Sequence, residues 1–209
     1  MTVSIVAIRA HGASDEVAVV FEICGDGETQ KETMILSAVD FADLRLAKGE
    51  VSEECFDAVL EVSKRYAARR RAMYILSYGG CSESRLAQKL RAKGIEAAIA
   101  KSVASELAEE GYLNEQGDAQ REAERNAAKL WGERRIVADL RAKGYASDAI
   151  RDAMDALCEQ IDFSELCACR IKRFFGEISE DPAERKRQIA SLERAGFSFS
   201  QIREATRRS

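Results

Sequence analysis

The chain of 209 residues has few of the residues that carry catalysis or covalent cross-links. It contains one histidine, one proline and one tryptophan, and its six cysteines include no Cys-x-x-Cys pair. The low cysteine content argues against a disulfide scaffold and predicts reduced thiols. No glycine-rich phosphate loop of the Walker type is present, which argues against ATP hydrolysis by the chain itself. We therefore expect a protein that is not an enzyme, with no catalytic residues, no cofactor and no metal site.

Long apolar runs are also missing. No uninterrupted run approaches the roughly 18 apolar residues that a membrane span needs, and the N-terminus lacks the basic start and apolar core of a secretory signal. Apolar residues make up 46% and charged residues 33% of the chain, which is typical of a soluble helical protein. We expect a cytoplasmic protein without membrane contact. The absence of a heptad seam argues against a coiled-coil dimer, and we expect a monomer.

What the sequence does contain is an internal repeat. Residues 86–95, 136–145 and 189–197 each place a leucine four positions before a glycine and an apolar residue directly after it. Apolar residues then recur at five matching distances beyond the first two glycines, and at two of these distances beyond the third. Each copy therefore predicts a helix, a glycine corner and a second helix. Such repetition indicates tandem units that bury their apolar faces against their neighbours.

The first 63 residues follow a different pattern. Apolar runs bounded by turn residues predict an antiparallel sheet with strands at 2–9, 16–23 and 31–36. A sheet this small needs a cover over its apolar face. We expect the cover to be a short helix that ends at Gly49 and a longer helix with its N-cap at Ser52.

From Ser52 onward the pattern is helical. We expect one helix from Glu53 to about Tyr78, with a break near Ala67, and a later helix capped by Ser147. The further helices are expected at 83–93, 97–109, 117–130, 133–143, 148–160, 163–174, 183–195 and 199–207.

The predicted fold class is mainly α, with tandem three-helix repeats in an elongated, curved array and a small N-terminal antiparallel β-rich segment. Four parts are expected along the chain. They are a β-rich N-terminal extension with its covering helices at 1–63, and three-helix repeats at 64–113, 114–162 and 163–209.

The charges are unevenly distributed along the chain. Residues 1–63 carry 4 basic and 13 acidic side chains, whereas residues 64–93 carry 9 basic side chains and one acidic side chain. A basic block beside acidic neighbours indicates either a surface for an acidic partner or a solvated helix face paired with its own neighbours. Arg85, Lys89 and Lys93 are spaced by four, which predicts a shared helical face. The candidate partner-binding residues are Arg69, Arg70, Arg71, Arg85, Lys89, Arg91, Lys93, Arg134, Arg135, Arg141, Lys143 and Arg187.

Several short motifs occur in a characteristic order and spacing, and together they resemble the RecX family of bacterial regulatory proteins. The resemblance covers most of the chain. The motifs are Leu76-Ser77-Tyr78 before Ser82, Leu86 and Leu90 with Lys93-Gly94, Glu110-Gly111-Tyr112-Leu113-Asn114, Gly132-Glu133-Arg134-Arg135-Ile136, Leu140 with Lys143-Gly144, and Arg194-Ala195-Gly196-Phe197. The chain departs from the family at Gly79-Gly80-Cys81, where members tend to carry charge, and in its weaker third copy.

The resemblance implies a modulator, usually an inhibitor, of the RecA recombinase, with a fold of tandem three-helix repeats. Such a protein would bind the RecA–DNA filament and limit its ATPase, strand-exchange and SOS-coprotease activities, with an accessory contact to single- or double-stranded DNA. The alternative is a helical DNA-binding module that acts without RecA, because helix–turn–helix proteins show the same local pattern. A sequence pI near 5.4 favours the protein partner.

Two smaller groups of residues are interpreted as structural. Cys167 and Cys169 lie two positions apart on a predicted helix, so their sulfurs face different ways, and core packing is the favoured role for both. Trp131, Phe174 and Phe175 lie near the junctions of the repeats and are interpreted as core residues rather than platforms for nucleic-acid bases.

Overall fold

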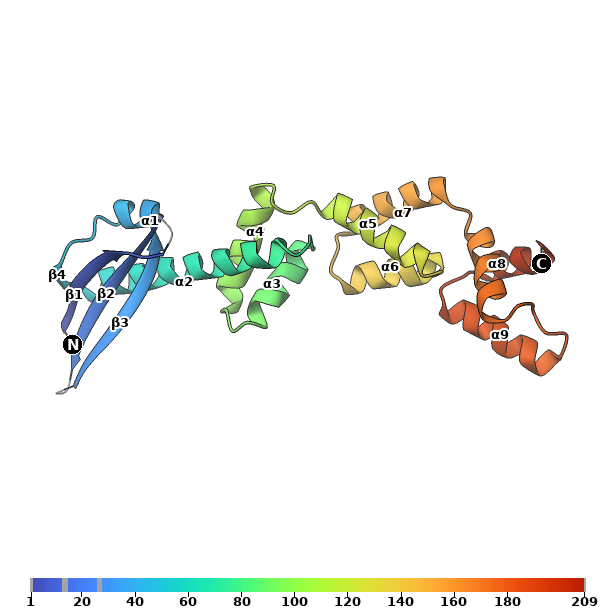
Figure 1. Ribbon diagram of the computed structural model, residues 1–209, viewed down its shortest axis with the longest axis horizontal. Helices are drawn as coiled ribbons and strands as arrows, with labels where there is room; N and C mark the ends of the chain where they lie inside the picture. The colour runs from blue at the N-terminus through green and yellow to red at the C-terminus, as the bar shows by residue number, and fades with distance from the viewer. Residues whose placement is uncertain (1, 13–14, 26–27, 209) are drawn as a thin grey trace. The chain divides into compact units, whose positions relative to one another are not determined.

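A computed structural model of the chain describes residues 2–12, 15–25 and 28–208. Within these ranges the chain forms four strands and ten helices, so the predicted mainly α fold with a small N-terminal antiparallel sheet is confirmed (Figure 1). The chain divides into two compact units. One comprises residues 1–78 and 89–103, and the other comprises residues 79–88 and 104–209.

The sheet of the first unit is antiparallel throughout, in the order β3-β2-β1-β4. Its strands are β1 (Thr2–Ala10), β2 (Glu16–Gly25), β3 (Glu28–Ser37) and β4 (Gly49–Val51). The three long strands were predicted, but the prediction that a short helix ends at Gly49 is wrong. The helix α1 (Ala38–Asp43) ends earlier, and Gly49 begins β4 opposite Ile5 with φ of +132°, a conformation that glycine adopts without strain.

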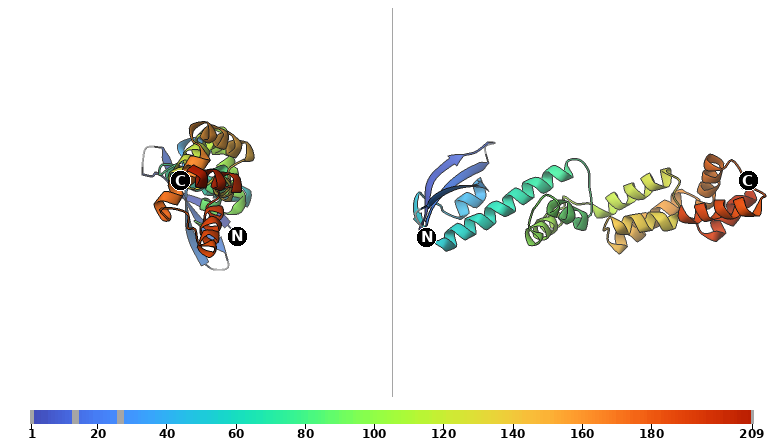
Figure 2. Two further views of the ribbon diagram at one scale, coloured as in Figure 1. Left: turned by 90° about the vertical axis from the view of Figure 1, so that its right-hand side faces the viewer. Right: turned by 90° about the horizontal axis from the view of Figure 1, so that it is seen from below.

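One face of the sheet is buried against the helix α2 (Glu53–Leu76), which Figure 2 shows running beside the strands. Successive side chains of a strand point to opposite faces, so alternate apolar residues of each strand share this face. Phe21 and Leu36 are fully buried there, next to Val59 of α2. The rings of Phe21 and Phe56 meet edge to face, with 5.1 Å between their centroids.

The helix α2 is a single continuous helix, so the predicted break near Ala67 is wrong. Ser52 caps it as predicted, because its side-chain oxygen accepts a hydrogen bond of 3.2 Å from the backbone N–H of Cys55. Alanine is the strongest helix former, and the buried residues Ala68 and Ala72 continue the helix through this region.

Eight shorter helices follow, close to the predicted ranges. They are α3 (Glu83–Arg91), α4 (Ala97–Glu109), α5 (Glu115–Ala128), α6 (Glu133–Ala142), α7 (Ser147–Gln160), α8 (Phe163–Phe174), α9 (Pro182–Arg194) and α10 (Phe199–Arg208). Ser147 is the first residue of α7 rather than its cap, which is Ala146, so that detail of the prediction is wrong. The division into three repeats at the boundaries given above stays a prediction.

The three glycine corners have the same backbone geometry. Gly94, Gly144 and Gly196 have φ of +84°, +77° and +98°, which lie in the left-handed region that favours glycine. The residue after each glycine donates its N–H to the leucine carbonyl five residues earlier, at 3.3, 3.2 and 3.2 Å respectively. This is the Schellman arrangement, which satisfies the last carbonyls of a helix. The internal repeat in the sequence therefore encodes a repeated helix ending.

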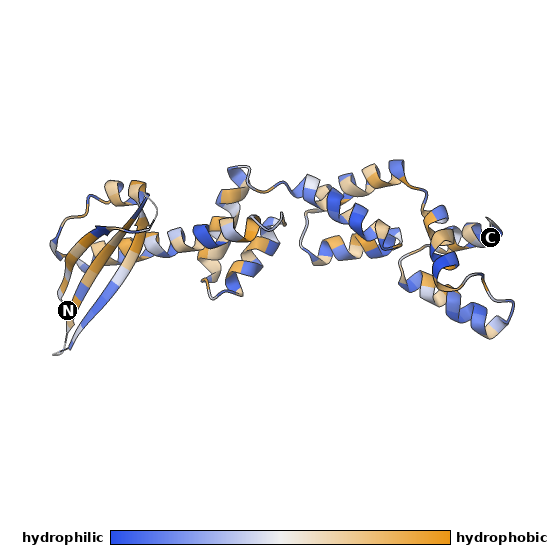
Figure 3. Ribbon diagram, in the orientation of Figure 1, coloured by the Kyte–Doolittle hydropathy of each residue, from blue (hydrophilic) through white to orange (hydrophobic). Residues whose placement is uncertain are grey.

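The second unit has its own core. Figure 3 shows hydrophilic and apolar residues interleaved along its helices, and the buried members come from α5 to α10. Leu140, Leu192 and Phe197 are fully buried in this core. The corners before α6 and after α9 approach closely, because the N–H of Gly132 donates to the carbonyl of Ala195 at 2.8 Å. This contact fixes the start of α6, which carries several of the candidate residues.

None of the helices in the described part of the chain has the length and apolar character that crossing a membrane requires.

Candidate partner-binding surfaces

The three candidate arginines of α2 have different surroundings. Arg70 forms an ion pair of 3.0 Å with Glu16 of β2, and the hydroxyl of Tyr66 donates to the same carboxylate oxygen at 3.0 Å. Arg70 thus helps to join α2 to the sheet. Arg71 is exposed and lies over the ring of Tyr74, with its Cζ 5.7 Å from the ring centroid. Arg69 is half-buried.

A groove in the first unit brings candidate residues from two segments together. It has a volume of about 520 Å³ and lies between α2 and the corner that joins α3 to α4. Arg71 and Lys93 line it together with Lys64, which is not among the candidate residues predicted from the sequence. The remaining lining residues are mostly small or apolar: Ala67, Ala68, Gly94, Ile95 and Ile99, with Glu96 as the one acidic residue among them. Three cations around an apolar floor suit an acidic ligand.

We predicted that Arg85, Lys89 and Lys93 share one face of a helix, and this prediction is wrong for Lys93. The helix α3 ends at Arg91, so Lys93 lies in the corner that follows it. Arg85 is exposed, and its Nη1 donates to Oε1 of Gln88 at 3.2 Å. Arg91 is exposed at the last position of the helix, where a cation interacts favourably with the helix dipole.

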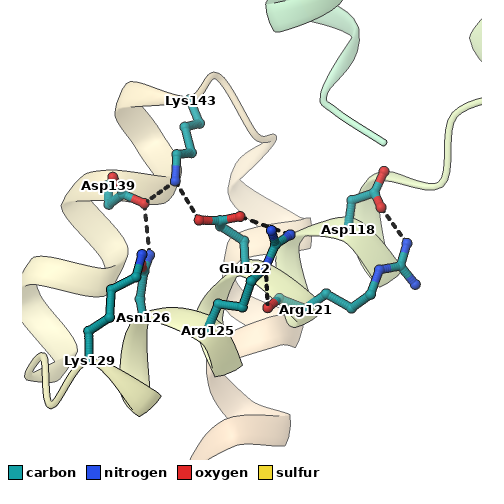
Figure 4. Close-up of polar contacts among 8 residues, drawn as sticks. All are labelled: Asp118, Arg121, Glu122, Arg125, Asn126, Lys129, Asp139 and Lys143. Carbon is teal, nitrogen blue, oxygen red and sulfur yellow. Dashed lines mark hydrogen bonds and ion pairs between the residues drawn. The ribbon is translucent and has the colours of Figure 1, made fainter. Parts of the chain in front are cut away.

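Lys143 lies at the end of α6 within a network of ion pairs (Figure 4). Its ammonium group lies 2.6 Å from Glu122 of α5 and 2.7 Å from Asp139 of its own helix. Asp139 also accepts a hydrogen bond of 2.8 Å from the amide of Asn126, whose oxygen accepts one of 3.0 Å from Lys129. The network joins α5 to α6, so Lys143 has a structural role as well as the predicted one.

The pKa values of this network follow from its geometry. Burial alone would raise the pKa of the Asp139 carboxyl, but hydrogen bonds from Lys143 and Asn126 outweigh burial, and the pKa lies below 3.8. Burial alone would lower the pKa of Lys143, but its bonds to Asp139 and Glu122 raise it above 10.5. Both groups are therefore charged at neutral pH.

The other candidates of the second unit, Arg134, Arg135, Arg141 and Arg187, are exposed. Arg135 packs its guanidinium over the ring of Trp131, with Cζ 3.8 Å from the centroid. Arg187 lies on α9 at a cavity of about 420 Å³ whose lining also includes Asp181 and Glu184, so its surroundings are mixed in charge.

Two structural interpretations from the sequence are wrong in part. Phe174 is 55% exposed at the end of α8, whereas Trp131 and Phe175 pack against the core as expected. Cys167 is fully buried, but Cys169 is exposed. The spacing of apolar residues in α8 could not reveal that Phe174 is exposed, because an aromatic residue at the end of a helix is usually part of the buried face.

The candidate cations are spread over helices of both units and are not gathered at one centre. Among the described residues, no group of three or more histidine, cysteine, aspartate or glutamate side chains could hold a metal ion. Arg70 and Lys143 pair with acidic residues of the chain, whereas most of the other candidate cations face a groove or solvent. The fold and these surfaces thus define a mainly helical protein with a small N-terminal sheet and exposed basic residues.

Comparison with known proteins shows to which family the chain belongs. Regulatory protein RecX of Stenotrophomonas maltophilia (strain R551-3) is 32% identical over 139 residues, which are 66% of this chain and 84% of that protein. Regulatory protein RecX of Xanthomonas campestris pv. campestris (strain B100) is 34% identical over 139 residues, or 66% and 85% of the two chains. The chain therefore belongs to the RecX family of regulatory proteins. No family model matches it.

Solved structures agree on the fold. A crystal structure of regulatory protein RecX aligns with 99% of this chain and 100% of its own, with a TM-score of 0.75 and 20% identity. The crystal structure of RecX from Lactobacillus salivarius covers 69% of this chain and 96% of its own, with a TM-score of 0.58 and 17% identity.

Proposed function

We propose that this protein regulates the RecA recombinase as an inhibitor. It binds the RecA–DNA filament and limits ATP hydrolysis, strand exchange and SOS-coprotease activity, as a cytoplasmic monomer without enzymatic activity of its own. The observation that carries the proposal is membership of the RecX family over most of a relative's length. The family is known for modulating RecA, as the resemblance in the sequence already implied.

The exposed cations support a charged contact with the filament. Arg85, Arg91, Arg134 and Arg141 project from α3 and α6 into solvent, and Arg71 and Lys93 line the groove of the first unit. Cations of this kind can meet acidic surface of RecA, phosphates of the bound DNA, or both. Arg70 and Lys143 bind acidic residues of their own chain, so we give them a smaller part in the contact.

The test is RecA-catalysed ATP hydrolysis on single-stranded DNA, with this protein added at well below one copy per RecA. We expect inhibition at such ratios, weaker at higher salt. A variant with Arg85→Glu, Lys89→Glu, Arg135→Glu and Arg141→Glu should need at least about tenfold more protein, which corresponds to about 1.4 kcal/mol.

The matched control reverses four cations that are all exposed. Arg9, Lys48, Lys101 and Arg203 lie outside the candidate set, and their change to Glu alters the net charge equally. We expect this control to inhibit almost as well as the wild type. Equal inhibition by all three proteins would refute the role of the chosen cations, and no effect of the wild type on RecA would refute the proposed function.

The DNA-binding module that acts without RecA remains the second candidate. It would be favoured if RecA were unaffected while the protein bound bare DNA in a salt-dependent manner.

A further inference from the structure

Aromatic rings and guanidinium groups alternate at one place in the second unit. We name this the Trp131–Phe174 cluster, and it consists of Lys129, Trp131, Arg135, Arg170, Arg173 and Phe174. Its residues come from the corner between α5 and α6, from the first turn of α6 and from the last turns of α8. Only Arg135 belongs to the candidate set from the sequence.

The α5–α6 corner holds one ring of the cluster. Leu130 has φ of +58°, and the N–H of Trp131 donates to the carbonyl of Asn126 at 3.3 Å, which ends α5 and directs the chain into α6. Arg135, one helical turn later, places its Cζ 3.8 Å from the centroid of the Trp131 ring. Lys129 places its ammonium group 5.1 Å from the same centroid. The indole ring is therefore bordered by two cations.

The end of α8 supplies the other ring. Phe174 is 55% exposed, and Arg170, one turn before it, places Cζ 4.6 Å from the centroid of its ring. Arg173 lies 5.9 Å from that centroid. Arg170 is also tied to the corner, because its Nη1 donates to the carbonyl of Leu130 at 2.9 Å. The two halves of the cluster are thus held together by a direct hydrogen bond.

Among the described residues, neither Arg135 nor Arg170 forms an ion pair with a carboxylate. The positive charge of these two residues is therefore not neutralised within the described part of the chain. The Nε of Arg170 is buried and has no hydrogen-bond partner there. Burial lowers the pKa of Arg170, and the nearby charge of Arg135 lowers it further. Two guanidinium groups that repel each other form a place where a bound anion would be stabilised.

We propose that the Trp131–Phe174 cluster binds single-stranded nucleic acid, with a backbone phosphate between Arg135 and Arg170 and an unpaired base on the exposed ring of Phe174. Arginine is suited to phosphate because its planar fork donates two parallel hydrogen bonds. An exposed aromatic ring beside such a fork is the combination that single-strand-binding proteins use, and stacking does not depend on the base. A duplex keeps its bases stacked on one another and offers the ring no free face.

The inference does not rest on the action on RecA, so its test contains no RecA. The full-length protein is titrated into a fluorescein-labelled oligothymidylate of about 20 nucleotides, and binding is followed by anisotropy. The intrinsic fluorescence of Trp131, the single tryptophan of the chain, is recorded in parallel with unlabelled oligomer. We expect binding that weakens with salt, together with a change in Trp131 fluorescence at the same protein–DNA ratios.

Two variants and two matched controls test the cluster. Phe174→Ala should weaken binding about tenfold, since stacking contributes roughly 1–3 kcal/mol per base. Arg173→Gln should weaken it less and reduce the salt dependence. Phe199→Ala removes an aromatic residue of α10 that is 64% exposed, and Lys172→Gln removes an exposed cation of α8. Both controls should bind nearly as the wild type does.

Competition identifies the ligand class. Unlabelled duplex of the same length and poly-glutamate, a model acidic peptide, should each displace the oligomer poorly. Displacement by poly-glutamate at equal charge would overturn the proposal and assign the cluster to an acidic protein. Tighter binding of the duplex would overturn it as well, and so would a Phe174→Ala variant that binds as tightly as the wild type. None of these results depends on whether the protein inhibits RecA.

Discussion

The ammonium group of Lys143 lies 2.6 Å from a carboxylate oxygen of Glu122, which links the end of α6 to the middle of α5. Lys93 occupies the equivalent position of the preceding copy of the repeat, one residue before the corner glycine, yet it lines the groove beside α2. The same repeated lysine thus stabilises the fold in one copy and faces an open surface in the other. Sequence repetition alone does not decide which cations are available to a partner.

This difference predicts separate effects of two neighbouring substitutions. Lys143→Met leaves Glu122, whose side chain is 13% exposed, without its ammonium partner, and we expect a loss of roughly 1 kcal/mol in the free energy of unfolding. Arg141→Met removes an exposed cation and should change that free energy by less than about 0.5 kcal/mol. Urea unfolding followed by circular dichroism measures both. Equal stability of Lys143→Met and the wild type would show that the network does not stabilise the fold.

The same network predicts a dependence on pH. Because the pKa of Asp139 is lowered from 3.8 in the fold, its contribution is present above that value and is lost as the pH falls through the folded pKa. Because the pKa of Lys143 is raised from 10.5, its contribution is present below that value and is lost as the pH rises beyond it. The stability difference between wild type and Lys143→Met should be constant between about pH 5 and pH 9 and should shrink below about pH 4.

Urea unfolding of both proteins across this range measures the difference. Asp139→Asn provides the control, since it removes one of the two carboxyls that pair with Lys143 and should reduce the acid-side change. A stability difference that stays constant down to about pH 2 would contradict the assigned cause.

The helix ends could be predicted from the sequence because the signals are local. The glycine corners at Gly94, Gly144 and Gly196, and the N-cap at Ser52, depend on residues within one turn of the chain. The strand β4 could not be predicted, because its three residues are ordered by pairing with β1 rather than by their own pattern.

The same difference between local signals and tertiary contacts explains which roles of the candidate site residues could be predicted. Basic residues are visible in the sequence, but their partners are not, since Arg70 pairs with Glu16 and Lys143 with Glu122 through the tertiary fold. Arg170 was not selected because it lies outside the basic block and outside the repeat pattern. Its hydrogen bond to the carbonyl of Leu130 connects residues that are 40 positions apart.

The close approach of two corners predicts a severe effect of a small substitution. A Cβ added at Gly132 would lie 2.3 Å from the backbone carbon of Gly196 and 2.4 Å from the backbone nitrogen of Phe197. Backbone atoms cannot turn aside as a side chain can, so Gly132→Ala should cost at least about 2–3 kcal/mol in the free energy of unfolding. Thermal unfolding followed by circular dichroism measures the loss.

Gly176→Ala is the control for this substitution. Gly176 has φ of +77° but meets no atom within 4 Å of the added Cβ, so only the backbone conformation is penalised, by roughly 1 kcal/mol. If the two variants lost equal stability, the contact between the corners would not be the cause.

The pair Phe21 and Phe56 predicts how the sheet depends on α2. Phe56→Ala removes a ring that is 9% exposed and meets Phe21 edge to face, and we expect a loss of about 3–5 kcal/mol from the first unit. Phe174→Ala removes an exposed ring and should leave stability nearly unchanged. Hydrogen exchange measured by mass spectrometry separates the units, since Phe56→Ala should accelerate exchange in β1 to β3 while the helices α5 to α10 keep their protection. Uniform acceleration over both units would contradict this assignment, because the two cores would then unfold as one.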